Sequence, residues 1–384
     1  MRGTLTSTAV TVGTLVPLLL LVALQPFIVN QSPGLRSFVS AVIAVHYLTV
    51  GLLSRPFGHA VDRLGFLRPA LVGVLAAALT AVVLSWHGAW PAGLLVGCVL
   101  AGAAVALGHT ASAVWVVHTV NPARHGVAMG VRQASVPISA LLAGVVAPVG
   151  AVALGTGAVF LVLVPPLLVI AVLVLTMRHD TVTANVAAVA VSRGRAPTSN
   201  GLRMLTLASA LGAGGANSAL ILVPVSAVDR GLGPADGALA LAIGGAVSAF
   251  GRVLIGSWID RRGVDPSRVA AVIMLAGAAT LAVSVLARSS VPFLVVTGLA
   301  LMGTGSWQGL LMLGAVQRRI DRPGAASGAM ASSAQLATGI TLLGLSAVTA
   351  HRSAIEAFWV PVILLSCAAL MVLASTVVRP RAGK

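Results

Sequence analysis

Arg132 stands inside a long apolar stretch, where a charged side chain is costly unless it faces a cavity or a partner. Ser135 and Ser139 follow it three and seven residues later, so a helix would carry all three on one face. We expect this polar stripe to bind a negatively charged group of a substrate. Two alternatives are that Arg132 extends to the membrane surface or pairs with a loop acid such as Asp321.

The acidic residues are few, and each falls in a predicted loop or at a predicted helix end: Asp62, Asp180, Asp229, Asp236, Asp260, Asp265, Asp321 and Glu356. A carboxylate proton relay in the middle of the membrane is therefore disfavoured. His46 and His109 are the remaining deep titratable candidates. Each can be a substrate or proton site, or a packed helix residue.

Other polar or aromatic residues are predicted to lie deep in the helices and to contact the substrate: Gln25, Tyr47, Asn217, Trp307 and Gln308. Amides can orient a ligand by hydrogen bonds, and tryptophan offers a flat apolar wall. The same residues could equally form contacts between helices.

The chain that must position these residues is 58% hydrophobic and 8% charged, whereas a soluble domain is roughly a quarter charged. Spans of about 20 apolar residues are expected. Twelve are predicted: 8–30, 36–57, 68–87, 92–118, 126–149, 152–176, 203–228, 236–257, 269–287, 292–316, 325–349 and 356–378. We therefore predict an all-α membrane protein with two six-helix bundles, 1–176 and 203–384, joined by a polar cytoplasmic linker, 177–202.

The net charge of +16 would suggest a nucleic-acid partner in a soluble protein. In this chain, 18 of the 24 basic residues fall on the side of the N-terminus and four on the other side. Arg132 and Arg252 fall within spans. The positive-inside rule then predicts a multi-pass protein of the inner or plasma membrane with both termini in the cytoplasm, and no nucleic-acid partner. Cys98 and Cys367 lie in apolar segments of opposite halves, and we expect no disulfide.

A segment at the end of the second span recurs 198 residues later: Gly58-His-Ala-Val-Asp62-Arg63-Leu-Gly65 and Gly256-Ser-Trp-Ile-Asp260-Arg261-Arg-Gly263. Pro26 with Pro224, Gly126 with Gly324, and Gly130 with Gly328 share the same offset. Parallel repeats of this kind place a substrate site between the halves, near the membrane midplane. The glycines that begin each copy are expected to allow close helix packing.

This pattern resembles the major facilitator superfamily along essentially the whole chain. The family's loop signature, G-x-x-x-D-R-x-G-R-[RK], is met by both copies, although Phe66 departs from it and Arg68 stands later than usual. The stretch 131–137 is similar to prokaryotic permease groups that include cyanate-permease-like proteins.

The resemblance implies alternating access by a rocker switch, with helices 1, 4, 7 and 10 lining the cavity. It also implies a cytoplasmic gate formed by the two copies: Gly58, Asp62, Arg63, Gly65, Gly256, Asp260, Arg261 and Gly263. Arg252, one turn before Gly256, is expected to join the second copy or to reach the membrane surface.

We therefore predict a secondary active or facilitative transporter, a monomer in the lipid bilayer. Its substrate would be a small anionic or zwitterionic organic solute, moved by diffusion, symport or antiport with protons or a counter-substrate. No cofactor, metal or enzymatic activity is expected, since no metal-ligand cluster, phosphate loop or nucleophile pattern is present.

One alternative is drug or hydrophobic-compound efflux by proton antiport. Exporters often carry G-P-x-x-G-G in helix 5, where this chain retains the proline, Pro137, without the glycines. Another is a membrane sensor without transport, which would need a signalling domain longer than the predicted termini allow.

Overall fold

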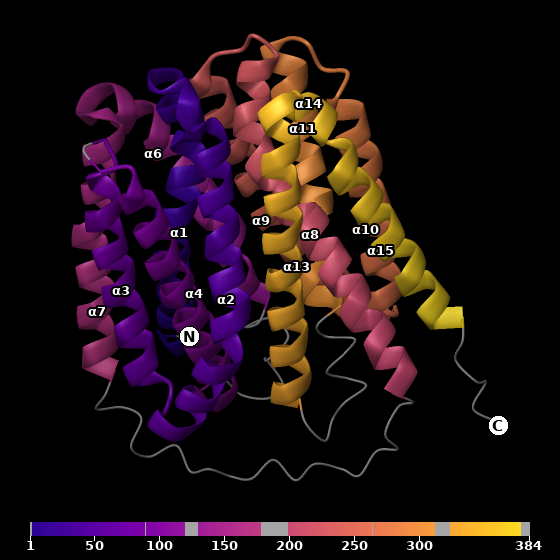
Figure 1. The fold of residues 1–384 in the computed structure, drawn as a ribbon. Coiled ribbons are helices and arrows are strands. Elements are labelled where there is room, and N and C mark those ends of the chain that lie inside the picture. The colour runs from indigo at the N-terminus through magenta and orange to yellow at the C-terminus, as the bar shows by residue number, and fades with distance from the viewer. Residues whose placement is uncertain are drawn as a thin grey trace, which may run out of the picture.

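The structure is a computed structural model that describes residues 2–88, 90–119, 130–177, 199–262, 264–311 and 323–377. Every regular element in these ranges is a helix, and most of them run side by side along one direction (Figure 1). The elements are α1 (Arg2–Gln31), η1 (Pro33–Leu35), α2 (Arg36–Leu64), α3 (Leu67–Ser85), α4 (Ala92–Thr119), α6 (Ser135–Ala158), η3 (Val159–Leu163), α7 (Val164–Thr176), α8 (Ser199–Asp229), α9 (Pro234–Arg262), α10 (Pro266–Ser284), α11 (Ser290–Gly305), α13 (Pro323–His351), α14 (Ala354–Ala357) and α15 (Trp359–Val377).

Eleven described stretches are long and apolar enough to cross a membrane, where twelve spans were predicted. Ten of them each match one predicted span, and the stretch Gly130–Thr176 contains the other two, 126–149 and 152–176. A straight helix of these 47 residues would be about 70 Å long, more than twice the hydrocarbon core of a bilayer. The chain instead turns at Gly155, whose φ of 82° suits glycine, so the stretch contains two helices, α6 and α7.

The internal repeat is visible in the helices. α2 and α9 are both 29 residues long, and their first residues and last residues are each 198 positions apart. Pro26 and Pro224 lie at matching positions inside α1 and α8. These two helices are the most buried of the candidate spans, so each forms the centre of its half of the molecule. The two halves are therefore built to the same plan.

The halves meet along two helix pairs, α2 with α13 and α6 with α9. Glycine permits the close approach of α6 and α9. A methyl group at Gly144 would lie 2.4 Å from the carbonyl oxygen of Ala238, and one at Gly245 would lie 2.4 Å from that of Pro137. The other pair is packed in the same manner through Gly51 and Gly339. Small residues let helix backbones approach closely where lipid supplies no hydrophobic drive for association.

Large apolar side chains remain exposed on the outer helices, among them Val152, Leu286 and Val291. In water such a surface would be unfavourable, but lipid tails cover it without cost. The fold is thus that of an all-helical membrane protein.

Candidate substrate cavity and the contacts between the halves

A cavity lies between the two halves, bounded by α6 on one side and by α8, α9 and α11 on the other. Its volume of about 30 Å³ leaves room for about two water molecules, so the halves must separate locally to admit an organic solute. The lining residues are Val136, Pro137, Ala140, Ala216, Asn217, Leu220, Gly244, Gly245, Ser248, Arg252, Leu301, Thr304, Gly305 and Gln308. None of these is acidic.

Two of the predicted binding residues, Asn217 and Gln308, line this cavity. The Asn217 side-chain amide donates to the Thr338 hydroxyl of α13 at 3.1 Å, which fixes its orientation. Gln308 lies in the helical turn that follows a break after α11. The sequence analysis did not identify Ser248 or Thr304, although both are polar lining residues.

Arg252 lies elsewhere than the sequence analysis placed it. The sequence analysis expected it to reach the membrane surface or to join the motif at Gly256, and the structure places it at the border of the cavity. One terminal nitrogen, Nη1, donates to the backbone carbonyl of Gln133, and Nη2 donates to that of Gly305 at 2.6 Å. Its spacing from Ser248 and Gly245, four and seven residues, places all three on one face of α9. That spacing was the available signal in the sequence.

Arg132 is buried, with 5% of its surface exposed, but it does not line the cavity. It lies in the helical residues 130–133, which a turn at Ala134 separates from α6. Its Nε donates to the Ser112 hydroxyl at 2.9 Å, and its Nη2 donates to the His109 carbonyl at 2.8 Å. The arginine predicted to contact substrate therefore holds α4 against the start of α6.

The serines that follow Arg132 are also buried. Ser135 donates to the Arg132 carbonyl at 2.5 Å, and Ser139 donates to the Ser135 carbonyl at 2.8 Å. These are local bonds to the preceding helical turn. The predicted polar stripe exists, but its hydroxyl protons are directed to the backbone.

The predicted histidines lie within the N-terminal half. His46 in α2 is buried with its ring edge toward the Tyr47 ring, 5.1 Å between centroids. Its Nδ1 and the Nε2 of His109 are buried without a hydrogen-bond partner among the described residues. None of His46, Tyr47 and His109 borders the cavity between the halves.

Two further predicted binding residues also lie away from the cavity. Trp307 is fully buried, and its ring packs so close to Gly212 of α8 that a methyl group there would lie 2.8 Å from it. The Gln25 side chain donates to the Ser40 hydroxyl at 2.9 Å and joins α1 to α2. Both residues make contacts between helices, the alternative that the sequence left open.

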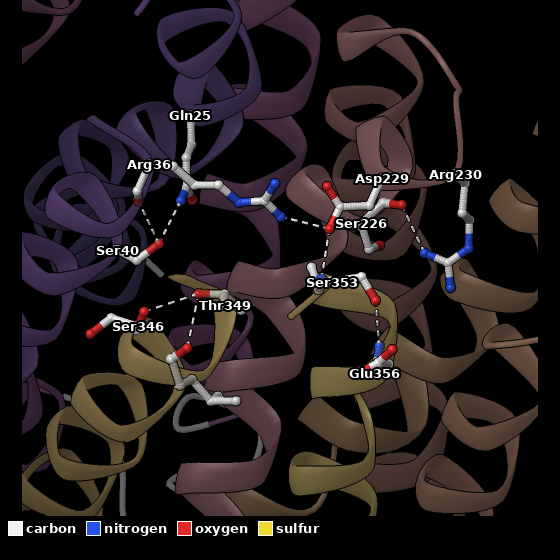
Figure 2. A network of polar contacts seen from close by, with 12 residues as sticks. Gln25, Arg36, Ser40, Ser226, Asp229, Arg230, Ser346, Thr349, Ser353 and Glu356 are labelled. Atoms are coloured by element: carbon white, nitrogen blue, oxygen red, sulfur yellow. Dashed lines mark hydrogen bonds and ion pairs between the residues drawn. The ribbon is translucent and has the colours of Figure 1, made fainter. Parts of the chain in front are cut away.

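A polar network joins the halves at the end of the molecule where α2 begins and α8 ends (Figure 2). The Arg36 guanidinium lies 2.6 Å from Asp229, as Nη2 to Oδ2. The same carboxylate oxygen accepts from the backbone N–H of Ala354, at the start of α14, at 2.6 Å. Asp229 therefore binds α2 of one half and orders the α13–α14 corner of the other.

The neighbouring Arg230 acts within the C-terminal half alone. Its guanidinium donates to the carbonyls of Ser226, Ser284 and Ala287 at 2.9 to 3.1 Å. It also lies 5.1 Å from the centre of the Phe293 ring, a cation–π contact. Burial lowers the pKa of this guanidinium to about 10, and the Asp229 carboxylate opposes that shift.

The repeated Asp-Arg segments lie in the last turns of α2 and α9, which end at Leu64 and Arg262. Gly65 ends α2 with a φ of 75°. A methyl group at Gly58 or Gly256 would meet no described atom within 4 Å, so neither makes the close helix contact expected of it. Arg63 and Arg261 are exposed. The side chains of Asp62 and Asp260, and Gly263, lie outside the described residues.

Comparison with known proteins agrees with this architecture. No curated protein sequence matches the chain. Its fold resembles the crystal structure of a D-xylose–proton symporter with a TM-score of 0.72, over 97% of this chain and 95% of that chain. At 14% identity this likeness shows the fold alone. A family model described as Major Facilitator Superfamily matches residues 6–342. The chain therefore belongs to the major facilitator superfamily and is a multi-pass membrane protein that acts as a secondary transporter of a small-molecule substrate.

Proposed function

We propose that this transporter moves a small anionic or zwitterionic organic solute through the cavity between its halves, by alternating access. The observation that carries the proposal is the position of Arg252. Arg252 lines the cavity, and none of the lining residues carries a carboxylate. The two acceptors that Arg252 contacts are neutral backbone carbonyls. A negatively charged substrate group would supply the missing countercharge.

The polar residues around Arg252 suit such a substrate. Asn217, Ser248, Thr304 and Gln308 border the same cavity and can donate or accept hydrogen bonds. An amino or hydroxyl group of a zwitterionic or hydroxylated substrate can bind to these side chains while its carboxylate binds Arg252. The remaining wall is made of glycines, alanines, leucines, a valine and a proline, which gives the apolar lining usual in ligand sites.

In this proposal the moving bodies are residues 1–176 and 203–384, linked by 177–202. Both termini lie in the cytoplasm, on the side of the 18 basic residues counted in the sequence. The helices that carry the two Asp-Arg segments, α2 and α9, then reach the cytoplasmic surface at equivalent points. Residues Gly58 to Gly65 and Gly256 to Gly263 form the cytoplasmic gate.

Efflux of lipophilic cations is the competing activity. A cation in the cavity would meet the positive charge of Arg252, and no lining carboxylate compensates for it. Cation binding at this site is therefore disfavoured relative to anion binding.

A thermal-shift screen of the purified protein tests the proposal. The panel contains organic anions (acetate, benzoate, succinate), amino acids (glutamate, glycine) and a lipophilic cation (tetraphenylphosphonium). A ligand that binds the native state raises the unfolding midpoint by mass action. We expect stabilisation by at least one anion or amino acid, and uptake of the same compound by proteoliposomes. Stabilisation by the lipophilic cation alone would overturn the proposal.

A further inference from the structure

Arg252 is bonded to both halves of the transporter at once. It lies on α9 of the C-terminal half, where Nη2 donates to the Gly305 carbonyl at the end of α11. Its Nη1 crosses to the N-terminal half and donates to the Gln133 carbonyl. A single guanidinium therefore connects α9, α11 and the chain that leads into α6.

Both acceptors lie where the helix supplies few backbone donors. In a regular helix the Gln133 carbonyl would accept from the backbone nitrogen of residue 137, but Pro137 has no N–H to donate. Gly305 is the last residue of α11, and turn residues follow it. The final carbonyls of a helix lack partners within the helix. Arg252 donates to both carbonyls, so one side chain connects an acceptor in each half.

The same guanidinium is available to a ligand in the cavity. Its side chain borders the cavity, and its Nε is buried without a hydrogen-bond partner among the described residues. The two terminal nitrogens of arginine, Nη1 and Nη2, form a planar fork that matches the two oxygens of a carboxylate, and these are the nitrogens that donate to the two carbonyls. Bonds from arginine to a charged oxygen are roughly twice as strong as bonds to a neutral one. An anion in the cavity would thus compete with the Gln133 carbonyl for Arg252.

We propose that Arg252 is a tie between the halves that the substrate itself releases: a bound anion draws the guanidinium away from the Gln133 carbonyl. This inference rests on the proposed anionic substrate. The tie holds α9 against the start of α6 while the cavity is empty of ligand. When the anion takes the guanidinium, the link to the N-terminal half is lost, and the halves separate at this point. Substrate recognition and the opening movement then share one side chain.

Close packing of α6 and α9 next to Arg252 links the Arg252–Gln133 bond to the separation of these helices. Gly245 lies two helical turns before Arg252 on the same face of α9, against the backbone of Pro137 and Leu141. Because these backbones are in direct contact, α6 cannot move relative to α9 without changing the position of Gln133 relative to Arg252. The Arg252–Gln133 bond therefore resists separation of the two helices and breaks when they separate.

The experiment measures how fast a cysteine in the cavity reacts with a water-soluble maleimide. Ala140, which lines the cavity on α6, is replaced by cysteine after Cys98 and Cys367 have been replaced by alanine. Arg252→Met removes all donors at similar side-chain length. Arg252→Lys keeps the charge but loses the fork. Arg268→Gln, an exposed arginine on α10, is the matched control for loss of one positive charge.

Without ligand, we expect Arg252→Met to label several-fold faster than the parent, and Arg268→Gln to label at the parent rate. The anion with the largest thermal shift in the panel above should accelerate labelling of the parent and leave Arg252→Met unchanged. The Arg252→Lys variant should also be labelled faster than the parent without ligand, and the anion should raise its unfolding midpoint by less than it raises that of the parent. If Arg252→Met does not fold, Arg252→Lys takes its place in the comparison. If both Arg252 variants are labelled at the parent rate without ligand, the proposal that Arg252 holds the two halves together is refuted.

The two proposals fail in different ways. If no anion or amino acid in the panel stabilises the parent protein, the proposed function fails and the release by substrate fails with it. If an anion stabilises the parent and both Arg252 variants equally, the function stands and the role of Arg252 is refuted. If the anion binds through Arg252 but does not accelerate labelling, Arg252 is a substrate contact and the release step is refuted.

Discussion

Arg36 and Asp229 form an ion pair between the two halves, with 2.6 Å between Nη2 and Oδ2. α9 begins five residues after Asp229, and Arg252 lies 18 residues further along that helix, about 27 Å away at 1.5 Å per residue. The contact of Arg252 with Gln133 therefore joins the halves far from the ion pair. The two connections stand toward opposite ends of the helices, and opening at either end requires one of them to break.

Loss of the ion pair should favour opening at its end of the molecule. Asp229→Asn keeps an oxygen that can accept from the Ala354 N–H but removes the charge that binds Arg36. The pair is partly exposed, at 30% and 10% for the two side chains, so its contribution is about 1 kcal/mol or less. We expect up to about a fivefold rise in labelling of a cysteine at Ser40, which lies beside Arg36.

Arg352→Gln is the control for this experiment. It removes an exposed ion pair with Glu356, 3.2 Å long, that lies within the C-terminal half. Labelling at position 40 should not change in this variant. Equal effects of the two substitutions would show that surface charge, rather than the contact between halves, controls access.

Arg132→Met should weaken the fold more than it weakens substrate binding. The substitution removes two buried hydrogen bonds from a charged donor, one to the Ser112 hydroxyl and one to the His109 carbonyl, each worth about 1.5–3 kcal/mol. We expect a lower unfolding midpoint with an unchanged dissociation constant for the stabilising anion. An unchanged midpoint with lost affinity would return Arg132 to the role of direct substrate contact.

Gly245→Ala should force α6 and α9 apart. The added methyl group would lie 2.4 Å from the Pro137 carbonyl oxygen and 2.6 Å from the Leu141 nitrogen, which real atoms do not tolerate. We expect faster cysteine labelling at position 140 and a lower unfolding midpoint. In Gly344→Ala, on α13, the new methyl group meets nothing within 4 Å, and the helix gains up to about 1 kcal/mol. A loss of stability in both variants would mean that helix glycines matter for a reason other than this contact.

Asp62→Asn should bias the transporter toward states open to the cytoplasm. An aspartate at the end of α2 can pair with an arginine or accept from the amides at the start of a neighbouring helix, and asparagine lacks the charge for either contact. Asp260→Asn in the second copy should act in the same direction, because α2 and α9 end at equivalent positions. Distance measurements between spin labels on the cytoplasmic ends of the halves would detect the shift. Unchanged distance distributions in both variants would argue against the gating role.

Much of the fold could be predicted because its main constraint is local in the sequence. A segment that crosses a bilayer must be apolar over about 20 residues, and ten of the predicted spans match single stretches of the structure. The repeat was visible as well, since equivalent turns need the same residue types. The turn at Gly155 was less clear, because apolar residues continue through it without a polar break.

The site was predictable only in part. Of the residues predicted to bind substrate, Asn217 and Gln308 line the cavity, whereas Arg132 and Trp307 make contacts between helices. Depth in a membrane span can be read from position in an apolar run. The direction in which a side chain points depends on the rotation of its helix about its own axis, which the neighbouring helices set.

The sequence by itself determined that this protein spans a membrane repeatedly, that it has two similar halves, and that its few acids lie outside the centre of the spans. These properties follow from composition and spacing, which the bilayer constrains directly. Only the tertiary structure decided which buried arginine borders the cavity. That outcome depends on packing across the halves: α6 approaches α9 through glycine, and the Gln133 carbonyl accepts from Arg252. Arg252, from a distant part of the chain, supplies the missing donor, and no local pattern around either residue contains that relationship.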